Sequence, residues 1–134
     1  MASAALHPLT LLAVMCGAAA GGLLRHAVTR LAMRRFGDSM PWGTLAVNLS
    51  GAVLAGLLGG LWYPGDWGQA GLASALFLIG LLGSYTTVSA LSLQTLELAQ
   101  DGRKGRALRY LLLTLGLGLP ATAAGLALAG WLAA

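Results

Sequence analysis

Charged residues are scarce in this chain. Lysine, arginine, aspartate and glutamate make up 9% of the 134 residues, whereas 57% of the residues are hydrophobic. Four windows, residues 1–24, 39–65, 67–96 and 110–134, contain none of these charged residues, and each can hold the roughly 20 apolar residues of a spanning helix. Little sequence is left for a soluble domain. We therefore expect an all-α membrane protein with four transmembrane helices in a single domain, residues 1–134.

Acidic residues are absent from the middle of every window. Asp38 and Asp66 fall between windows, Glu97 lies at the end of the third predicted span, and Asp101 lies just beyond it. Proton-coupled antiport of cations normally requires an acid embedded in the membrane. This pattern argues against a small proton-coupled exporter of the multidrug-resistance type, although that function remains an alternative.

Only one cysteine is present, Cys16, and it lies inside the first window. A packed thiol is favoured there over a disulfide or a metal ligand. The N-terminus also lacks the lysine or arginine that opens a secretory signal peptide. We therefore expect the first window to be kept as a span.

The four spans are predicted at approximately residues 8–30, 43–63, 69–97 and 108–132. Pro120 falls inside the fourth span. It should kink that helix unless a neighbouring group satisfies the carbonyl that it frees.

Glycines that allow close helix contact lie on the first two spans. Gly17 and Gly21 form one GxxxG motif, and Gly56 and Gly60 form another. Two uses are open for these motifs, packing within the chain and association between chains.

Basic residues are confined to the first and third predicted loops and to the adjoining span ends. They are Arg25, Arg30, Arg34, Arg35, Arg103, Lys104, Arg106 and Arg109. Four spans place these two loops on the same side, so the positive-inside rule predicts both loops in the cytoplasm and both termini outside. No nucleic-acid partner is expected, because the net charge is only +4 and the basic residues lie close to span ends.

Hydroxyl side chains cluster inside the third window. Six of them fall within the ten residues Gly83–Ser92, where an unpaired polar group would be costly in hydrocarbon. Gly80, Gly83 and the β-branched pair Thr86–Thr87 are poor helix formers. We therefore expect the third helix to be broken near its middle, with carbonyls free to bind a cation.

Polar residues also recur at helical spacing on the second and fourth spans, as Thr44 with Asn48 and Tyr110 with Thr114. Asn48 is either a hydrogen-bonding link between helices or an ion contact. A path of hydroxyls and a carboxamide without an acid suits an anion. Arg25 either raises the anion concentration at its mouth or anchors the span at the interface.

Three motifs resemble the Fluc (CrcB) fluoride channels over essentially the whole chain. They are GGLLRH at Gly21–His26, GTLAVNLSG at Gly43–Gly51 and GLLGSYTTVSALS at Gly80–Ser92. The resemblance implies a small antiparallel dimer in the bacterial plasma membrane that releases fluoride passively through two pores, and not an enzyme.

The resemblance also implies roles for individual residues. Backbone carbonyls of Gly83 and Thr86 would hold a structural Na⁺, which is not transported, at the dimer centre. The fluoride pathway would use Asn48, Thr44, Ser89, Tyr110 and Thr114, and Arg25 would line an aqueous vestibule.

Two features of this chain depart from the family pattern. The pathway positions that carry phenylalanine in the family motif TTFSxF are Val88 and Leu91 here, and aliphatic side chains cannot offer an electropositive ring edge. The charge bias also favours one fixed orientation in the membrane. We therefore expect a partner of opposite orientation, either a homologue that supplies the missing residues or a second copy. A non-conducting scaffold subunit is the remaining alternative.

Overall fold

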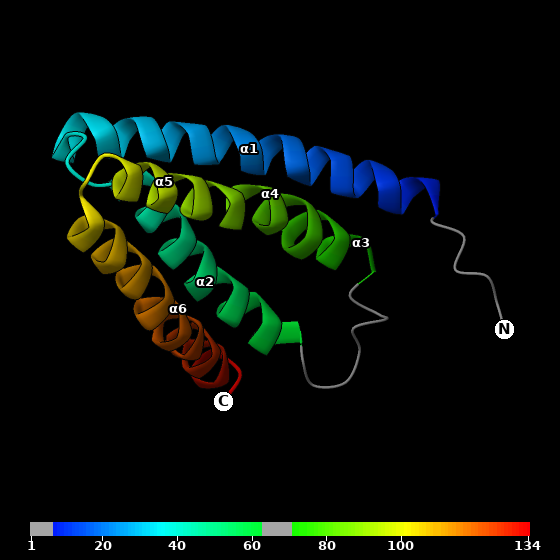
Figure 1. Cartoon of the computed structure of the whole chain (residues 1–134). Helices are drawn as coiled ribbons and strands as arrows, with labels where there is room; N and C mark the ends of the chain where they lie inside the picture. Colours follow the sequence, from blue (N-terminus) through cyan, green and yellow to red (C-terminus); the bar gives the residue numbers. More distant parts are fainter. Residues whose placement is uncertain (1–6, 63–70) are drawn as a thin grey trace, which may run out of the picture.

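The computed structural model describes residues 7–62 and 71–134, which are almost entirely helical (Figure 1). Its elements are α1 (Pro8–Phe36), α2 (Trp42–Trp62), α3 (Gly71–Ser74), η1 (Ala75–Leu82), α4 (Gly83–Tyr85), α5 (Val88–Gln100) and α6 (Lys104–Leu132). The segments α3, η1, α4 and α5 follow one another along a third rod, which we call the third span. With that rod, the described residues contain four helices long and apolar enough to cross a membrane, which confirms the predicted fold.

The helix ends differ from the predicted spans at the basic loops. α1 continues to Phe36 instead of ending at residue 30, and α6 begins at Lys104 instead of residue 108. Arginine, leucine, alanine and methionine favour helix, so the chain stays helical beyond the apolar window. Gly37 then ends α1 with φ of 73°, and its N–H donates to the Met33 carbonyl. The predicted limits at residues 63 and 69 lie outside the described residues.

Backbone contact joins α1 to the π-helical segment η1. A Cβ added to Gly17 would collide with the Leu76 carbonyl, and one added to Gly21 would collide with the Leu81 carbonyl. The first GxxxG motif therefore serves packing within the chain.

The second glycine motif has the same use between α2 and α6, which lie side by side in Figure 1. A Cβ on Gly56 would meet the Thr122 carbonyl, and a Cβ on Gly125 would meet the Val53 carbonyl. Gly60 lies against Ala129. α6 itself runs through Pro120 as one continuous helix.

The wider π-helical segment η1 ends at Leu82, and the short α4 separates it from the break of the third span. The N–H of Gly83 donates to the carbonyls of Leu78 and Gly80, which lie five and three residues earlier. Such π-helical segments are rare and frequently occur at functional sites.

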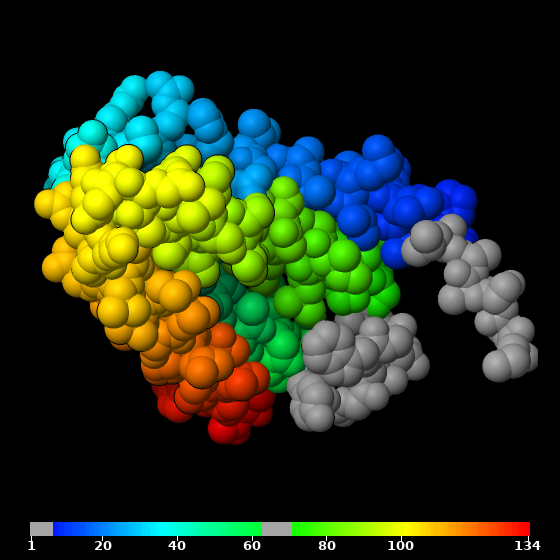
Figure 2. Space-filling view, viewed as in Figure 1, coloured from blue at the N-terminus to red at the C-terminus, as the bar shows by residue number. Residues whose placement is uncertain are grey.

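The two basic loops lie at one end of the molecule, as predicted. Arg106 Nη1 donates to the Ser39 carbonyl at 3.3 Å, and Arg109 Nη2 donates to Met40 Sδ at 3.1 Å. Figure 2 shows the α1–α2 connection (cyan) and the α5–α6 connection (yellow to orange) at the same end.

Candidate functional site

The third span is interrupted at Thr86 and Thr87, which confirms the predicted break. Thr86 has φ of −80° and ψ of 161°, and Thr87 has φ of −156° and ψ of 123°, so both are extended. Thr87 restarts the helix as the N-cap of α5, because its Oγ1 accepts the Ala90 N–H at 3.1 Å.

Asn48 on α2 satisfies the backbone at this interruption. The Thr87 N–H donates to Asn48 Oδ1 at 2.9 Å, and Asn48 Nδ2 donates to the Thr87 carbonyl at 3.0 Å. Asn48 therefore links α2 to the third span, which is one of the two uses predicted for it from the sequence. A carboxamide nitrogen carries two N–H groups, so a second donor remains beyond the bond to Thr87.

The same hydrogen bonds release two backbone carbonyls. In a continuous helix the Gly83 carbonyl would bind the Thr87 N–H, and the Thr86 carbonyl would bind the Ala90 N–H. Those amides donate instead to Asn48 Oδ1 and Thr87 Oγ1. Carbonyl oxygens freed in this way are suitable ligands for Na⁺. The residues present therefore fit the cation that the sequence resemblance implies.

A polar pocket of about 280 Å³ opens beside the break. Its lining comes from α1, α2 and the third span, and consists of Gly22, Arg25, His26, Thr29, Thr44, Thr87, Ala90 and Gln94. This set holds a guanidinium and several hydrogen-bond donors but no carboxylate. Such a lining favours an anion over a cation.

Tyr110 on α6 is hydrogen-bonded to one of the residues that line this pocket. It is fully buried, and its Oη donates to Gln94 Oε1 at 2.9 Å. The Thr114 hydroxyl donates to the Tyr110 carbonyl at 2.9 Å. Hydrogen bonds thus connect Thr114 and Tyr110 of α6 to Gln94 of α5.

Gln94 was missed in the sequence analysis. It lies seven residues after Thr87 on the same helix, and this spacing places both on one face. That spacing was the available signal, but only the fold shows that this face meets Tyr110.

Val88 and Leu91, the aliphatic residues at the phenylalanine positions, have different surroundings. Val88 is 76% exposed, whereas Leu91 is 6% exposed and packs in a core cluster with Leu45 and Tyr110. Ser89 is exposed beside Val88, and its Oγ lies 3.1 Å from Thr87 Oγ1.

Three further hydroxyls of the third span bind their own helix. Thr86, Ser92 and Thr95 each donate to the carbonyl four residues earlier, which is the simpler use of such side chains in a helix. Tyr85 is an exception, because its Oη lies 2.8 Å from Ser50 Oγ on α2. Neither Tyr85 nor Ser50 was assigned a role from the sequence.

An interrupted third span, bonded to its neighbour by an asparagine beside a polar pocket without carboxylates, defines a small four-helix membrane protein with a polar break in its third span. A family model described as "CrcB-like protein, Camphor Resistance (CrcB)" matches residues 12–126. The chain belongs to this family.

Curated relatives match most of the chain. A "Fluoride-specific ion channel FluC 2" of Rhodopseudomonas palustris is 43% identical over 132 residues, covering 92% of this chain and 95% of the relative. One of the same name from Bradyrhizobium diazoefficiens is 39% identical over 119 residues, covering 88% and 87%. A "Fluoride-specific ion channel FluC" of Rhodospirillum rubrum is 41% identical over 102 residues, covering 71% and 74%.

Proposed function

We propose that this chain is a subunit of a fluoride-selective channel that lets fluoride leave the cytoplasm passively, without a chemical step. The observation that carries this proposal is the polar pocket beside the break, whose lining holds Arg25 and no carboxylate. The names of the matched relatives supply the identity of the ion.

The proposed pathway begins at Arg25 and His26, continues past Thr44 and Gln94, and reaches the break at Thr87. Fluoride is a small, strongly hydrated anion, so hydrogen-bond donors must replace its water shell. The second N–H of Asn48 and the hydroxyl of Ser89 provide donors at the break. Tyr110 would hold Gln94 in place along this path, and the Thr114 hydroxyl bonds the Tyr110 carbonyl.

A structural Na⁺ would be held by the carbonyls of Gly83 and Thr86. The support is the diversion of both helical donors to side chains, which leaves these oxygens available. The ion would fix the geometry of the break and would not be transported.

The functional unit is proposed to be an antiparallel dimer in the plasma membrane. The break presents exposed Ser89 and Val88, and an extended backbone with hydroxyls is tolerated in a bilayer only where protein or water covers it. A partner crossing at the break would provide that cover. The eight basic residues at one end favour a single orientation, with that end in the cytoplasm and both termini outside.

Fixed orientation and the aliphatic Val88 together favour an oppositely oriented homologue as the partner. Fluoride efflux from liposomes, followed with a fluoride electrode, tests this proposal. We expect little efflux from liposomes that hold this protein alone, and rapid efflux when an oppositely oriented family member is reconstituted with it. Rapid efflux with this protein alone would favour a homodimer.

The same assay separates the two other candidate functions. A passive channel keeps its efflux when a protonophore collapses the pH gradient, whereas a proton-coupled exporter that needs Glu97 loses transport. No fluoride efflux in either reconstitution, with assembly intact, would show that the chain is a scaffold and would overturn the proposal.

A further inference from the structure

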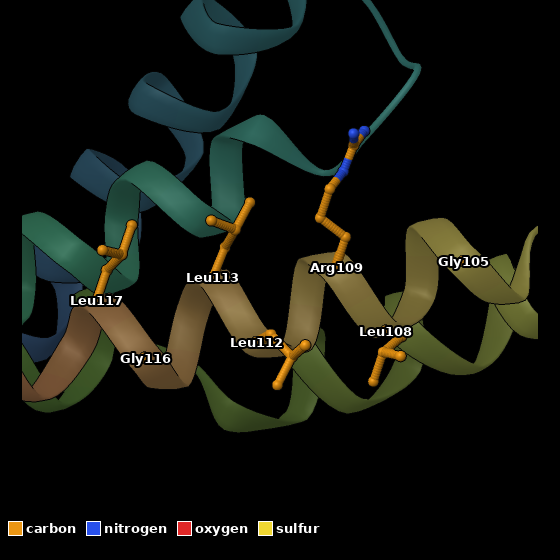
Figure 3. A pocket seen from close by; sticks show the side chains of 7 residues that line it. All are labelled: Gly105, Leu108, Arg109, Leu112, Leu113, Gly116 and Leu117. Atoms are coloured by element: carbon orange, nitrogen blue, oxygen red, sulfur yellow. The ribbon is translucent and has the colours of Figure 1, made fainter.

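Two concave surfaces adjoin each other on the outer side of α6. The first, which we call the arginine cup, has a volume of about 530 Å³ and is lined by Arg103, Gly105, Arg106 and Arg109. The second, which we call the α6 groove, has a volume of about 490 Å³. Its lining consists of Gly105, Leu108, Arg109, Leu112, Leu113, Gly116 and Leu117 (Figure 3). Gly105 and Arg109 belong to both, so the cup opens directly into the groove.

Leucine side chains form the walls of the α6 groove. In Figure 3, Leu113 and Leu117 project to one side of the helix, and Leu108 and Leu112 project to the other. Gly116 presents no side chain along this face. The groove is therefore an elongated apolar surface that could receive a linear apolar chain, and it begins at the arginine cup.

The groove glycines have no packing role within the chain. A Cβ on Gly56 or Gly125 would collide with the backbone of the facing helix, but a Cβ on Gly105 or Gly116 would meet nothing within 4 Å. Glycine is less favourable than alanine inside a helix. Gly118 and Gly130 on the same helix are equally open, so this observation shows only that the surface of α6 at Gly105 and Gly116 is free to receive another molecule.

Arg106 and Arg109 of the arginine cup carry charge that their hydrogen-bond partners do not neutralise, whereas Arg103 also lines a pocket with Asp38, Glu97 and Asp101. Arg106 and Arg109 donate to the Ser39 carbonyl and to Met40 Sδ, and neither acceptor is charged. Each guanidinium has five N–H donors, so donors remain for an external anion. Arg103, Arg106 and Arg109 are all exposed.

We propose that the arginine cup and the α6 groove together bind an anionic glycerophospholipid. The headgroup phosphate pairs with Arg103, Arg106 and Arg109, and one acyl chain lies in the groove between the leucine walls. Clusters of basic residues at the cytoplasmic end of spanning helices recognise anionic headgroups in this way. No residue of the cup or groove lines the polar pocket, so this inference stands apart from the proposed function.

Charge complementarity favours a lipid over a second copy of the chain. Residues 110–134 of α6 and the C-terminus contain no charged side chain, and the beginning of α6 is basic. A second copy that docks through α6 would bring either the same arginines or an uncharged surface to the cup. An anionic lipid supplies both the negative charge and the apolar tail.

Native mass spectrometry of the full-length protein in detergent tests the proposal. The probes are dioleoyl-phosphatidylglycerol and dioleoyl-phosphatidylcholine, which differ only in the headgroup. We expect the wild-type protein to bind the anionic lipid at least tenfold more tightly. The double variant Arg106→Gln with Arg109→Gln should bind it roughly 10- to 30-fold more weakly, since each basic residue at a membrane surface contributes about fivefold.

Matched variants distinguish binding at this site from a general attraction of anionic lipids to basic residues. Arg30→Gln with Arg34→Gln removes two exposed arginines from the same end of the molecule and should keep the preference. Gly116→Leu fills the groove without an internal clash and should weaken binding at unchanged charge. Gly130→Leu is its control, because a Cβ on Gly130 also meets nothing within 4 Å.

Melting temperatures show whether each variant is folded, so that loss of lipid binding is not confused with misfolding. The anionic lipid should raise the melting temperature of the wild-type protein and of both controls, but not that of the Arg106/Arg109 or Gly116 variants. Equal binding of the two lipids by the wild-type protein would overturn the proposal. So would a groove variant that keeps its lipid but changes from dimer to monomer, because the face would then bind a second copy.

Discussion

Asn48 and Thr87 exchange two hydrogen bonds across 39 residues of sequence, at 2.9 Å and 3.0 Å. The carboxamide oxygen accepts the N–H that would continue the helix of the third span, and its nitrogen donates to the carbonyl of the same residue. One side chain therefore stabilises both polar groups of an extended residue inside a membrane helix. Every role proposed for the break depends on this pair.

Replacing Asn48 with alanine should destabilise the protein by roughly 1–3 kcal/mol. The substitution leaves the partly buried N–H and carbonyl of Thr87 without partners, and unsatisfied groups of this kind cost about that much. The melting temperature should fall, and so should fluoride efflux when the variant is reconstituted with its oppositely oriented partner. Ser92→Ala is the control, because the Ser92 hydroxyl bonds only its own helix at Val88. A variant of Asn48 with unchanged melting temperature would contradict the assigned role.

Tyr110→Phe should weaken the contact between α6 and α5. It removes the donor to Gln94 Oε1, and a net loss of about 1 kcal/mol is expected for one such hydrogen bond. A double-mutant cycle with Gln94→Leu, measured by chemical unfolding in detergent, isolates the pairwise contribution. Purely additive effects of the two changes would show that the bond contributes nothing to stability.

Phenylalanine should be tolerated at Val88 but not at Leu91. Val88 is 76% exposed, so a ring adds no internal strain, whereas Leu91 is 6% exposed and overpacking a core costs about 1–3 kcal/mol. The melting temperatures of Val88→Phe and Leu91→Phe provide the comparison. If Val88 belongs to the pathway, Val88→Phe should also raise fluoride efflux above that of the wild-type protein.

Gly56→Ala should destabilise the contact of α2 with α6 by roughly 1–3 kcal/mol, because the added Cβ would collide with the Thr122 carbonyl. Gly130→Ala is the matched control on α6, where nothing lies within 4 Å of the new methyl group. It should be neutral or slightly stabilising through helix propensity. Equal melting temperatures for the two variants would show that the helices do not approach as closely as described.

Labelling from one side of the membrane tests the fixed orientation. Cys16, which was expected to be packed but is exposed in the structure, is first changed to alanine, and single cysteines are placed as Arg34→Cys and Ala134→Cys. In intact cells an impermeant maleimide should label the cysteine at position 134 and not the one at position 34. Permeabilised cells should show labelling at both. Partial labelling of both sites in intact cells would show that the chain inserts in two orientations, as a homodimer requires.

Composition and spacing were sufficient to predict the four spans, the break in the third and the shared end of the two basic loops. These features follow from local properties, namely uncharged windows, poor helix formers and the placement of arginine. The glycine motifs predicted close contact but not its partners. Sequence spacing cannot tell whether Gly17 meets η1 of the same chain or a second subunit, because that depends on how the spans pack.

The hydrogen bonds and side-chain exposures at the break could not be predicted from the sequence. Thr87 resembles its neighbouring hydroxyl residues in the sequence, and only the position of α2 reveals that Asn48 takes over its backbone. The π-helical turns of η1 arise from a shift of hydrogen bonds between residues such as Leu78 and Gly83, which leaves no compositional signal. Likewise, the different exposure of Val88 and Leu91 depends on which helices cover α5.

The interruption at Thr86 and Thr87 has an electrostatic consequence. Helix dipoles place roughly half a negative charge at the end of the first half-helix and roughly half a positive charge at the start of α5. Because the two halves follow one another along the same rod, these opposite poles meet within two residues. A cation at the Gly83 and Thr86 carbonyls and an anion at the first amides of α5 would each complement the nearer pole and attract each other. One interruption of a membrane helix would thus provide a place for both members of an ion pair in the bilayer.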